Sequence, residues 1–397
     1  MKRRIATFHW MQLLALAAVH FLIDLFASML PAILPAIRME FEFRLSLGVI
    51  LLGTLTMTSN GIQPLTGHLR AGKRNPMFLH LGLILGAGIC LLDAVPRGDG
   101  AFAVMILLAV VSGFGIAIVH PEGLRAVHRL RRIRPAVSTA VFMAGGFLGY
   151  ASGGAVSALL VSRFGLRGLY PLALCPVIGI VLIGWLRVRL AVEPKVQAKD
   201  RARTERNQLS FWLILAMAIP AAISTTVLAS LLPTVLNELG FDLTFGGFST
   251  TMFGLGGAIG SFVWADIAHK KGEFKCIVAS LFLVIPFLAA YLMLINNKMA
   301  IWMLFGAGFF AVSAYILMIT LSRQATGLTL GHRMGFMVGG TWAVASVFFM
   351  ALSPAIEHFG ADVILKFSPL GYLCSGAFGL LVMLKAQSSA WAKLSAR

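Results

Sequence analysis

Asp24 is a carboxylate inside an otherwise apolar run, 10–37, that is long enough to cross a membrane. A charged side chain at the centre of a bilayer costs at least ~2.5–3.5 kcal/mol on insertion scales, so one that persists usually faces a cavity. His20 lies one helical turn before Asp24 and Ser28 one turn after, so the three side chains share a helical face. Because histidine changes its charge near neutral pH, this stripe predicts proton coupling at Asp24 and His20, with Ser28 in an adjoining cavity. The alternative is a structural hydrogen bond that fixes this helix against a neighbour.

A second polar cluster, His120-Pro121-Glu122-Gly123-Leu124-Arg125, ends the fourth apolar run. Proline and glycine interrupt the hydrogen-bond ladder of a helix, which a membrane tolerates where the backbone lines a cavity. Glu122 and Arg125 lie one turn apart, so they could pair, or either could face a substrate. His120, Glu122 and Arg125 are therefore candidates for the substrate cavity. The alternative is an ion pair at the membrane interface, with Arg125 as part of the basic loop that follows.

Weaker candidates for the cavity are uncharged. Asn60 and Gln63 lie on one face of the second run, where hydrogen bonds between helices explain them about as well as a substrate does. Thr226 has the place in the seventh run that Asp24 has in the first. The aromatic candidates, which could also face lipid, are Phe142, Tyr150, Tyr315 and Trp342.

The fifth run carries a face of small residues. Such a face predicts close packing against another helix, and a sliding interface would use it too. Its members are Gly145, Gly146, Gly149, Gly153 and Gly154.

Membrane-spanning helices must position these residues. Of the 397 residues, 58% are hydrophobic and only 12% are charged, which is about half the charged share of a soluble domain. The chain lacks a long polar domain and has room for twelve spans, so we predict an all-α membrane protein. We place the spans at 10–37, 45–68, 77–95, 101–127, 136–162, 170–189, 210–236, 246–268, 276–295, 299–322, 335–356 and 363–385.

Lys and Arg collect on one side of such a bundle. The side with both termini holds 26 of the 33, including the runs Arg125–Arg134 and Arg187–Arg206, and the other side holds 7. Since positively charged loops stay in the cytoplasm, both termini are predicted to be cytoplasmic, in a bacterial inner membrane. The formal net charge of +18 is then a topology signal and not a sign of nucleic-acid binding.

The chain divides into two similar halves. The longest polar stretch separates six spans in 1–189 from six in 210–397, with 190–209 as a cytoplasmic linker. Ala27-Ser28-Met29-Leu30-Pro31 in span 1 matches Ala229-Ser230-Leu231-Leu232-Pro233 in span 7. A duplicated bundle with its site at the repeat interface is how many secondary transporters achieve alternating access, so two pseudo-symmetric six-helix bundles are predicted.

Several other functions are disfavoured. Four cysteines lie singly in apolar runs, so neither a disulfide nor a metal site is predicted. The motifs G-x-x-x-x-G-K-[ST], H-E-x-x-H and G-x-S-x-G are missing from the sequence, which argues against ATP-driven transport and against these hydrolases. We expect no enzyme activity and no cofactor; the expected partners are lipid, protons and a small-molecule substrate, and the expected state is a monomer.

Three segments resemble the fosmidomycin-resistance branch of the Major Facilitator Superfamily: His20–Pro35, Gln63-Pro64-Leu65 with Gly67, and His120-Pro121-Glu122-Gly123 with Arg125. Members of that branch are similar to proton-driven antiporters that expel a small anionic phosphonate drug. The resemblance implies that Asp24 and His20 carry proton coupling. It also implies that Glu122 and Arg125 shape the part of the cavity that faces the cytoplasm.

The chain departs from the superfamily pattern in two loops. Ala71 follows Arg70 where members usually carry an Asp that locks the cytoplasmic gate, and His269 stands where Asp is common in the second half. We therefore assign Arg70 and His269 to gating as a hypothesis, with a solvated loop as the alternative for His269. Gly153-Gly154 replaces the Gly-Pro of many antiporters, which leaves the direction of transport open.

The leading hypothesis is a proton-coupled antiporter that exports a small polar or anionic drug or metabolite. The second is a proton-coupled importer of a siderophore or an organic acid. The third is a sensor or scaffold that keeps the fold without transport. Asp24 argues against the third, because an unused charge in mid-membrane is costly.

Overall fold

Long apolar helices make up most of the described part of the protein. A computed structural model describes residues 2–70, 72–192 and 209–395, and its described part contains 12 helices long and apolar enough to cross a membrane. The twelve predicted spans are thereby confirmed, with ends shifted by a few residues. The first span, for example, runs from Thr7 to Phe41. Ala71 and most of the proposed linker lie outside the described residues.

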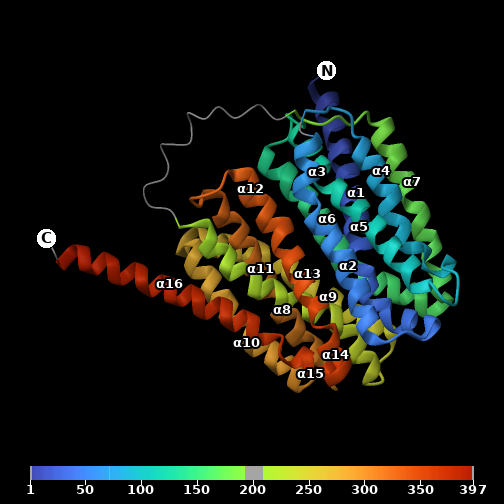
Figure 1. The fold of residues 1–397 in the computed structure, drawn as a ribbon. Coiled ribbons are helices and arrows are strands. Elements are labelled where there is room, and N and C mark those ends of the chain that lie inside the picture. Colours follow the sequence, from blue (N-terminus) through green and yellow to red (C-terminus); the bar gives the residue numbers. More distant parts are fainter. Residues whose placement is uncertain (1, 71, 193–208, 396–397) are drawn as a thin grey trace.

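The helices of the first half follow the predicted order (Figure 1). Each span is one helix or two consecutive helical segments. The elements are α1 (Lys2–Phe41), α2 (Leu45–Gly61), α3 (Gln63–Arg70), α4 (Met77–Gly86), η1 (Ala87–Ala94), α5 (Ala101–His128), α6 (Pro135–Phe164), η2 (Leu166–Leu169) and α7 (Tyr170–Trp185).

The second half repeats this arrangement, and Figure 1 shows the two halves beside each other in the blue-to-green and yellow-to-red parts of the chain. A π-helical turn, η5, interrupts its fifth span. The elements are α8 (Phe211–Glu238), α9 (Leu243–Lys271), α10 (Glu273–Met293), η4 (Lys298–Ala300), α11 (Ile301–Gln324), α12 (Leu330–Gly335), η5 (Phe336–Gly340), α13 (Thr341–Ala351), α14 (Ser353–Phe359), α15 (Ala361–Lys366) and α16 (Pro369–Ser395).

The contacts between the halves follow a two-fold pattern. Span 5 (α6) packs on span 8 (α9), and span 2 (α2) packs on span 11 (α13). Spans 8 and 11 are the second and fifth of their own half, so the two interfaces are exchanged by the pseudo-symmetry. Such a pair of equivalent interfaces is what two related bundles form when they enclose a site between them.

The outside of the bundle is apolar, as a lipid-facing surface requires. Large hydrophobic side chains such as Leu174, Phe262 and Leu107 are 60% exposed or more, while Phe26, Phe349 and Tyr372 are fully buried between helices. A soluble protein would rarely leave so much contiguous apolar surface open to water. The exposed apolar surface therefore agrees with the membrane location inferred from the spans.

The glycine face of α6 lets this helix touch α1 backbone to backbone. A Cβ atom added at Gly145 would lie 2.3 Å from the carbonyl oxygen of Ala17, and one at Gly149 would lie 2.0 Å from that of Phe21. Neither position accepts a larger residue without a shift of the helix. The predicted close packing of the fifth span is confirmed, and it brings α6 directly against the polar stripe of α1.

Two polar contacts join the halves at the end of the bundle formed by the loops 41–45 and 238–243, here called the opposite face. Arg38 at the end of α1 lies 3.6 Å from Glu238 at the end of α8. The backbone N–H of Ser46 donates to Glu357 at 2.9 Å. The loops that carry most of the basic residues, such as 70–77, lie at the other end, here called the basic face.

Candidate functional site

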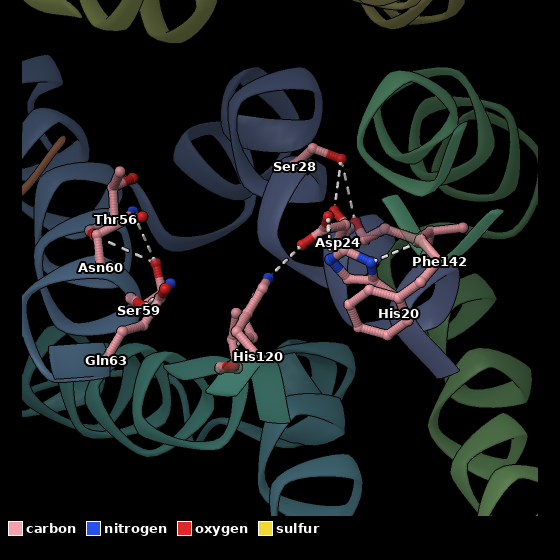
Figure 2. Close-up of polar contacts among 11 residues, drawn as sticks. His20, Asp24, Ser28, Thr56, Ser59, Asn60, Gln63, His120 and Phe142 are labelled. Carbon is pink, nitrogen blue, oxygen red and sulfur yellow. Dashed lines mark hydrogen bonds and ion pairs between the residues drawn. The ribbon is translucent and has the colours of Figure 1, made fainter. Parts of the chain in front are cut away.

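Asp24 lies halfway along the first span, between two histidines (Figure 2). Its Oδ2 is 3.3 Å from Nε2 of His20, one turn earlier on α1, and its Oδ1 is 3.0 Å from Nε2 of His120 on α5. The side chains of Asp24 and His120 are 17% and 21% exposed, whereas that of His20 is 4% exposed. The predicted stripe of α1 therefore meets the predicted cluster of α5 in one group, here called the His–Asp–His cluster.

Each histidine of the cluster is fixed by the backbone on its far side. Nδ1 of His20 lies 2.8 Å from the carbonyl oxygen of Phe142, and its ring stacks on the Phe142 ring at a centroid distance of 4.1 Å. Nδ1 of His120 lies 2.8 Å from the carbonyl oxygen of Ile116, one turn earlier on α5. Phe142, predicted as a cavity residue, is 2% exposed and acts instead as the support of His20.

Gly146 on α6 closes the cluster from one side. A Cβ atom at this position would lie 2.4 Å from Cε1 of His20 and 2.5 Å from Oδ2 of Asp24. The absence of a side chain therefore lets His20 and Asp24 occupy their places. Sequence reasoning assigned Gly146 to close helix packing, which a sliding interface would also use, and only the tertiary structure shows that it contacts the polar group.

The three donor atoms of the cluster lie within 4.8 Å of one another, which is close enough for a single ion. The sequence predicted no metal here. The carboxylate meets the two ring nitrogens at 3.0 and 3.3 Å, which are also hydrogen-bond distances, so the three groups can share protons.

A pocket lies between the two halves, one turn of α1 beyond Asp24. The first half contributes Ala27, Leu30, Pro31, Leu52, Leu55, Thr56 and Tyr150. The second half contributes Thr225, Thr226, Ala229, Ser230 and Trp342. The lining offers hydroxyl groups and two aromatic rings, and none of these residues is charged.

Three predicted cavity residues, Tyr150, Thr226 and Trp342, lie on this pocket. Tyr315 lies behind it, because its ring packs against Trp342 at a centroid distance of 4.9 Å and its hydroxyl donates to the carbonyl of Met337.

Sequence reasoning missed Thr56, Thr225 and Ser230 on the pocket. A signal for Ser230 was present, since it matches the predicted cavity residue Ser28 in the internal repeat.

The remaining polar candidates of spans 1 and 2 bond to their own helices (Figure 2). The hydroxyl of Ser28 donates to the carbonyl of Asp24 at 3.2 Å and not to its carboxylate. Asn60 donates to the carbonyl of Thr56, and Gln63 to that of Ser59, each at 2.9 Å. These contacts satisfy donors that would otherwise be exposed to an apolar environment, and they set Asn60 and Gln63 apart from the His–Asp–His cluster.

Glu122 belongs to a second polar group near the basic face. Its Oε1 accepts a hydrogen bond from Nε of Arg70 at 2.8 Å, and its Oε2 accepts from the backbone N–H groups of Phe78 and Leu79 at 2.9 and 3.2 Å. The two N–H groups belong to the first turn of α4, where a helix favours negative charge. With 1% of its surface exposed, Glu122 ties α3, α4 and α5 together.

Arg125 completes this group, and it is 5% exposed. It donates to the carbonyl oxygens of Arg70, Lys73 and Ala191 at 2.7, 2.6 and 3.1 Å. Arg125 thus joins the loop between spans 2 and 3 to the chain that follows α7. Glu122 and Arg125 were predicted to pair or to face substrate, but neither is among the residues that line the pocket.

The two gating candidates differ in their surroundings. Arg70 is held by Glu122 and by the carbonyl of Asn75 at 2.8 Å, within the first half. His269 lies in the last turn of α9 and is exposed.

Comparison with known proteins identifies the family. The model of the Major Facilitator Superfamily matches residues 16–354. The chain is 23% identical over 365 residues to YfnC, an uncharacterized MFS-type transporter of Bacillus subtilis (strain 168), covering 88% of this chain and 87% of that protein. It is 26% identical over 171 residues to the fosmidomycin resistance protein of Escherichia coli (strain K12), covering 43% of this chain and 41% of that protein.

Solved structures show the same fold. A bacterial homolog of the human lysosomal transporter Spinster, in an inward-facing and unoccupied conformation, aligns with a TM-score of 0.72 at 15% identity, covering 94% of this chain and 96% of that one. The occupied form aligns with a TM-score of 0.68 at 15% identity, covering 93% and 95%. With a family model matched over most of its length and twelve spans in this arrangement, the chain belongs to the Major Facilitator Superfamily and is a secondary transporter, not an enzyme.

Proposed function

We propose that this transporter couples proton movement to the export of a small polar or anionic compound, by alternating access between the halves 1–189 and 210–397. The observation that carries the proposal is the position of Asp24, halfway along the first span, between two imidazoles and one helical turn from the pocket. A carboxylate at this depth is costly, and in membrane proteins such groups usually mark proton or substrate pathways.

Alternating access gives Asp24 a means to load and unload a proton. Removal of water from a carboxylate favours its neutral form, and renewed contact with water favours its ionised form. A cavity that opens in turn to each side of the membrane changes the hydration of Asp24 in this way. His20 contacts one carboxylate oxygen of Asp24 and His120 contacts the other, so the two rings adjust how tightly the proton is held.

The substrate is proposed to bind in the pocket between the halves. Its hydroxyl and aromatic lining, from Thr56, Tyr150, Thr225, Ser230 and Trp342, suits a small polar molecule with hydrogen-bonding groups. The likeness to the fosmidomycin resistance protein covers 43% of this chain, and it supports fosmidomycin as the first compound to test.

Import is the second candidate, favoured by the lack of charge in the pocket lining. The protonated histidines of the neighbouring cluster would attract an anion that is bound in the pocket. Anion and proton would then bind together and move in the same direction, as in the uptake of an organic acid.

Proteoliposomes with an enclosed pH-sensitive dye test the proposal, with fosmidomycin and a panel of organic acids as probes. Export by antiport predicts that substrate and protons move in opposite directions, and uptake by symport predicts the same direction. Asp24→Asn should strongly lower proton-driven accumulation and retain substrate binding. Asp99→Asn, the same change in an exposed loop, should behave as the wild type. If Asp24→Asn accumulates substrate at the wild-type rate, Asp24 is structural and the proposal is wrong.

The proposed orientation places both termini and the basic face in the cytoplasm of a bacterial cell, which follows from the distribution of Lys and Arg. Labelling of a cysteine introduced within 195–206 tests it in intact cells. A membrane-impermeant reagent should leave this site unlabelled from outside, and labelling from outside only would reverse the topology.

A further inference from the structure

The tautomer of each histidine in the His–Asp–His cluster is set by the backbone. Nδ1 of His20 and Nδ1 of His120 each lie 2.8 Å from a carbonyl oxygen, of Phe142 and of Ile116. A carbonyl oxygen only accepts hydrogen bonds, so both Nδ1 atoms must carry a hydrogen. In a neutral ring the other nitrogen, Nε2, is then a bare acceptor.

Both Nε2 atoms point at the carboxylate of Asp24. Nε2 of His20 meets Oδ2 at 3.3 Å, and Nε2 of His120 meets Oδ1 at 3.0 Å. A bare ring nitrogen and a carboxylate oxygen are both acceptors and repel each other, so each contact requires a proton of its own. One proton on the cluster satisfies one contact and leaves the other with two facing acceptors.

From this geometry we infer that the His–Asp–His cluster binds two protons as a unit, one in each contact. The two protons can lie on both rings, or on one ring and the carboxyl group, and in either case the cluster carries a net charge of +1. With no added proton, its charge is −1. Because the three groups share their protons, the two binding steps belong to the cluster and not to Asp24 alone.

Within the part of the chain that the structure describes, little else near the cluster supplies charge. Among the described residues, the ion pairs of Asp24 are those with His20 and His120. Tyr150 on α6 interacts with Asp24 electrostatically and is a titratable neighbour. The α6 backbone at Gly146 fills another side, and across the pocket α8 presents the uncharged Thr225 and Thr226. The protons themselves therefore set the charge of the cluster.

The consequence for transport rests on the proposed function. If both protons cross the membrane in each cycle, a tenfold proton gradient drives an uncharged substrate to a concentration ratio of about 100-fold, against about tenfold for one proton. His120 on α5 then takes part in carrying protons, together with His20 and Asp24 on α1.

Asp24→Asn provides a sharp comparison. The amide group of the Asn side chain donates to one bare Nε2, while its carbonyl oxygen needs a donor from the other ring. The variant should therefore hold one proton in the cluster where the wild type holds two. The Asn side chain is close in size to Asp, so the packing against Gly146 is retained.

The test is nitrogen-15 and carbon-13 NMR of the full chain in lipid bilayers, titrated with acid, with labels in histidine and aspartate. The signals of His20 and His120 are identified by their loss in His20→Gln and in His120→Gln, and His358→Gln, an exposed residue on α14, is the control. We expect protonated Nδ1 in both rings and a plateau at two protons in the wild type, counted over both Nε2 atoms and the carboxyl group. Asp24→Asn should show a plateau at one.

A wild-type plateau at one proton, or a bare Nδ1 in either ring, would overturn the inference. The same applies if a chelator changes the ring signals, because an ion then occupies the place of the protons. The measurement needs no substrate, so it separates the two proposals. A cluster that holds two protons in a protein that does not couple them to transport would refute the proposed function and leave the inference standing.

Discussion

Replacement of Gly146 by alanine should disrupt the His–Asp–His cluster without removing any of its side chains. The added Cβ would lie 2.4 Å from Cε1 of His20 and 2.5 Å from Oδ2 of Asp24. Non-bonded carbon atoms prefer about 3.5–4.0 Å, so these groups must move by roughly 1 Å. Such a shift takes the contacts of Asp24, now 3.0 and 3.3 Å, to about 4 Å, where they are no longer hydrogen bonds.

Gly145→Ala is the matched control. Its Cβ would lie 2.3 Å from the carbonyl oxygen of Ala17, so it overpacks the same interface between α1 and α6 away from the cluster. Overpacking of this kind costs typically about 1–3 kcal/mol, and we expect both variants to lower the thermal unfolding temperature. Only Gly146→Ala should also change the NMR signals of His20 and His120.

The outcome separates a local effect from a global one. If both alanine variants leave the ring signals of His20 and His120 unchanged, the contact of α6 with the cluster is not tight and the reasoning from Gly146 is wrong. If both variants change the signals equally, the cluster responds to the spacing of α1 and α6 as a whole, and Gly146 has no special position.

Three further predictions concern groups outside the His–Asp–His cluster. Glu122→Ala should lower the free energy of unfolding by about 3–5 kcal/mol in denaturant or thermal melts, because Arg70 is left buried without its carboxylate; a loss under about 1 kcal/mol would contradict the geometry. Arg38→Gln should cost less than about 1 kcal/mol, since its pair with Glu238 is partly exposed. A bifunctional thiol reagent that cross-links Arg38→Cys to Glu238→Cys should block transport, and turnover by the cross-linked protein would exclude movement at the opposite face. His269→Gln should alter the pH profile of transport; an unchanged profile assigns His269 to a solvated surface.

The membrane character and the order of the spans followed from local sequence alone. A run of roughly 20 apolar residues has one stable form in lipid, a helix whose backbone bonds are internal, so composition predicts the twelve spans without knowledge of their neighbours. The stripe of His20, Asp24 and Ser28 was also readable, because residues one turn apart on a helix share a face. The repeat of Ala27–Leu34 in Ala229–Leu236 indicated the two related halves.

The partners of these polar groups depend on the rotation and depth of each helix, which a local pattern does not specify. His120 was placed with Glu122 and Arg125 because they are close in sequence, yet His120 turns toward Asp24 while Glu122 binds Arg70. The surface of a membrane helix is almost uniformly apolar around its axis. Hydrophobic periodicity therefore did not show which side of α5 faces α1.

Sequence by itself therefore determined that this chain spans a membrane twelve times and carries a carboxylate at mid-depth in the first span. Only the tertiary structure decided that Asp24 has two imidazole partners, that Gly146 leaves room for them, and that both rings turn Nε2 toward the carboxylate. The physical reason is that hydrogen-bond geometry across helices arises from packing, where glycine contacts and backbone carbonyls of distant residues fix the position and tautomer of each side chain.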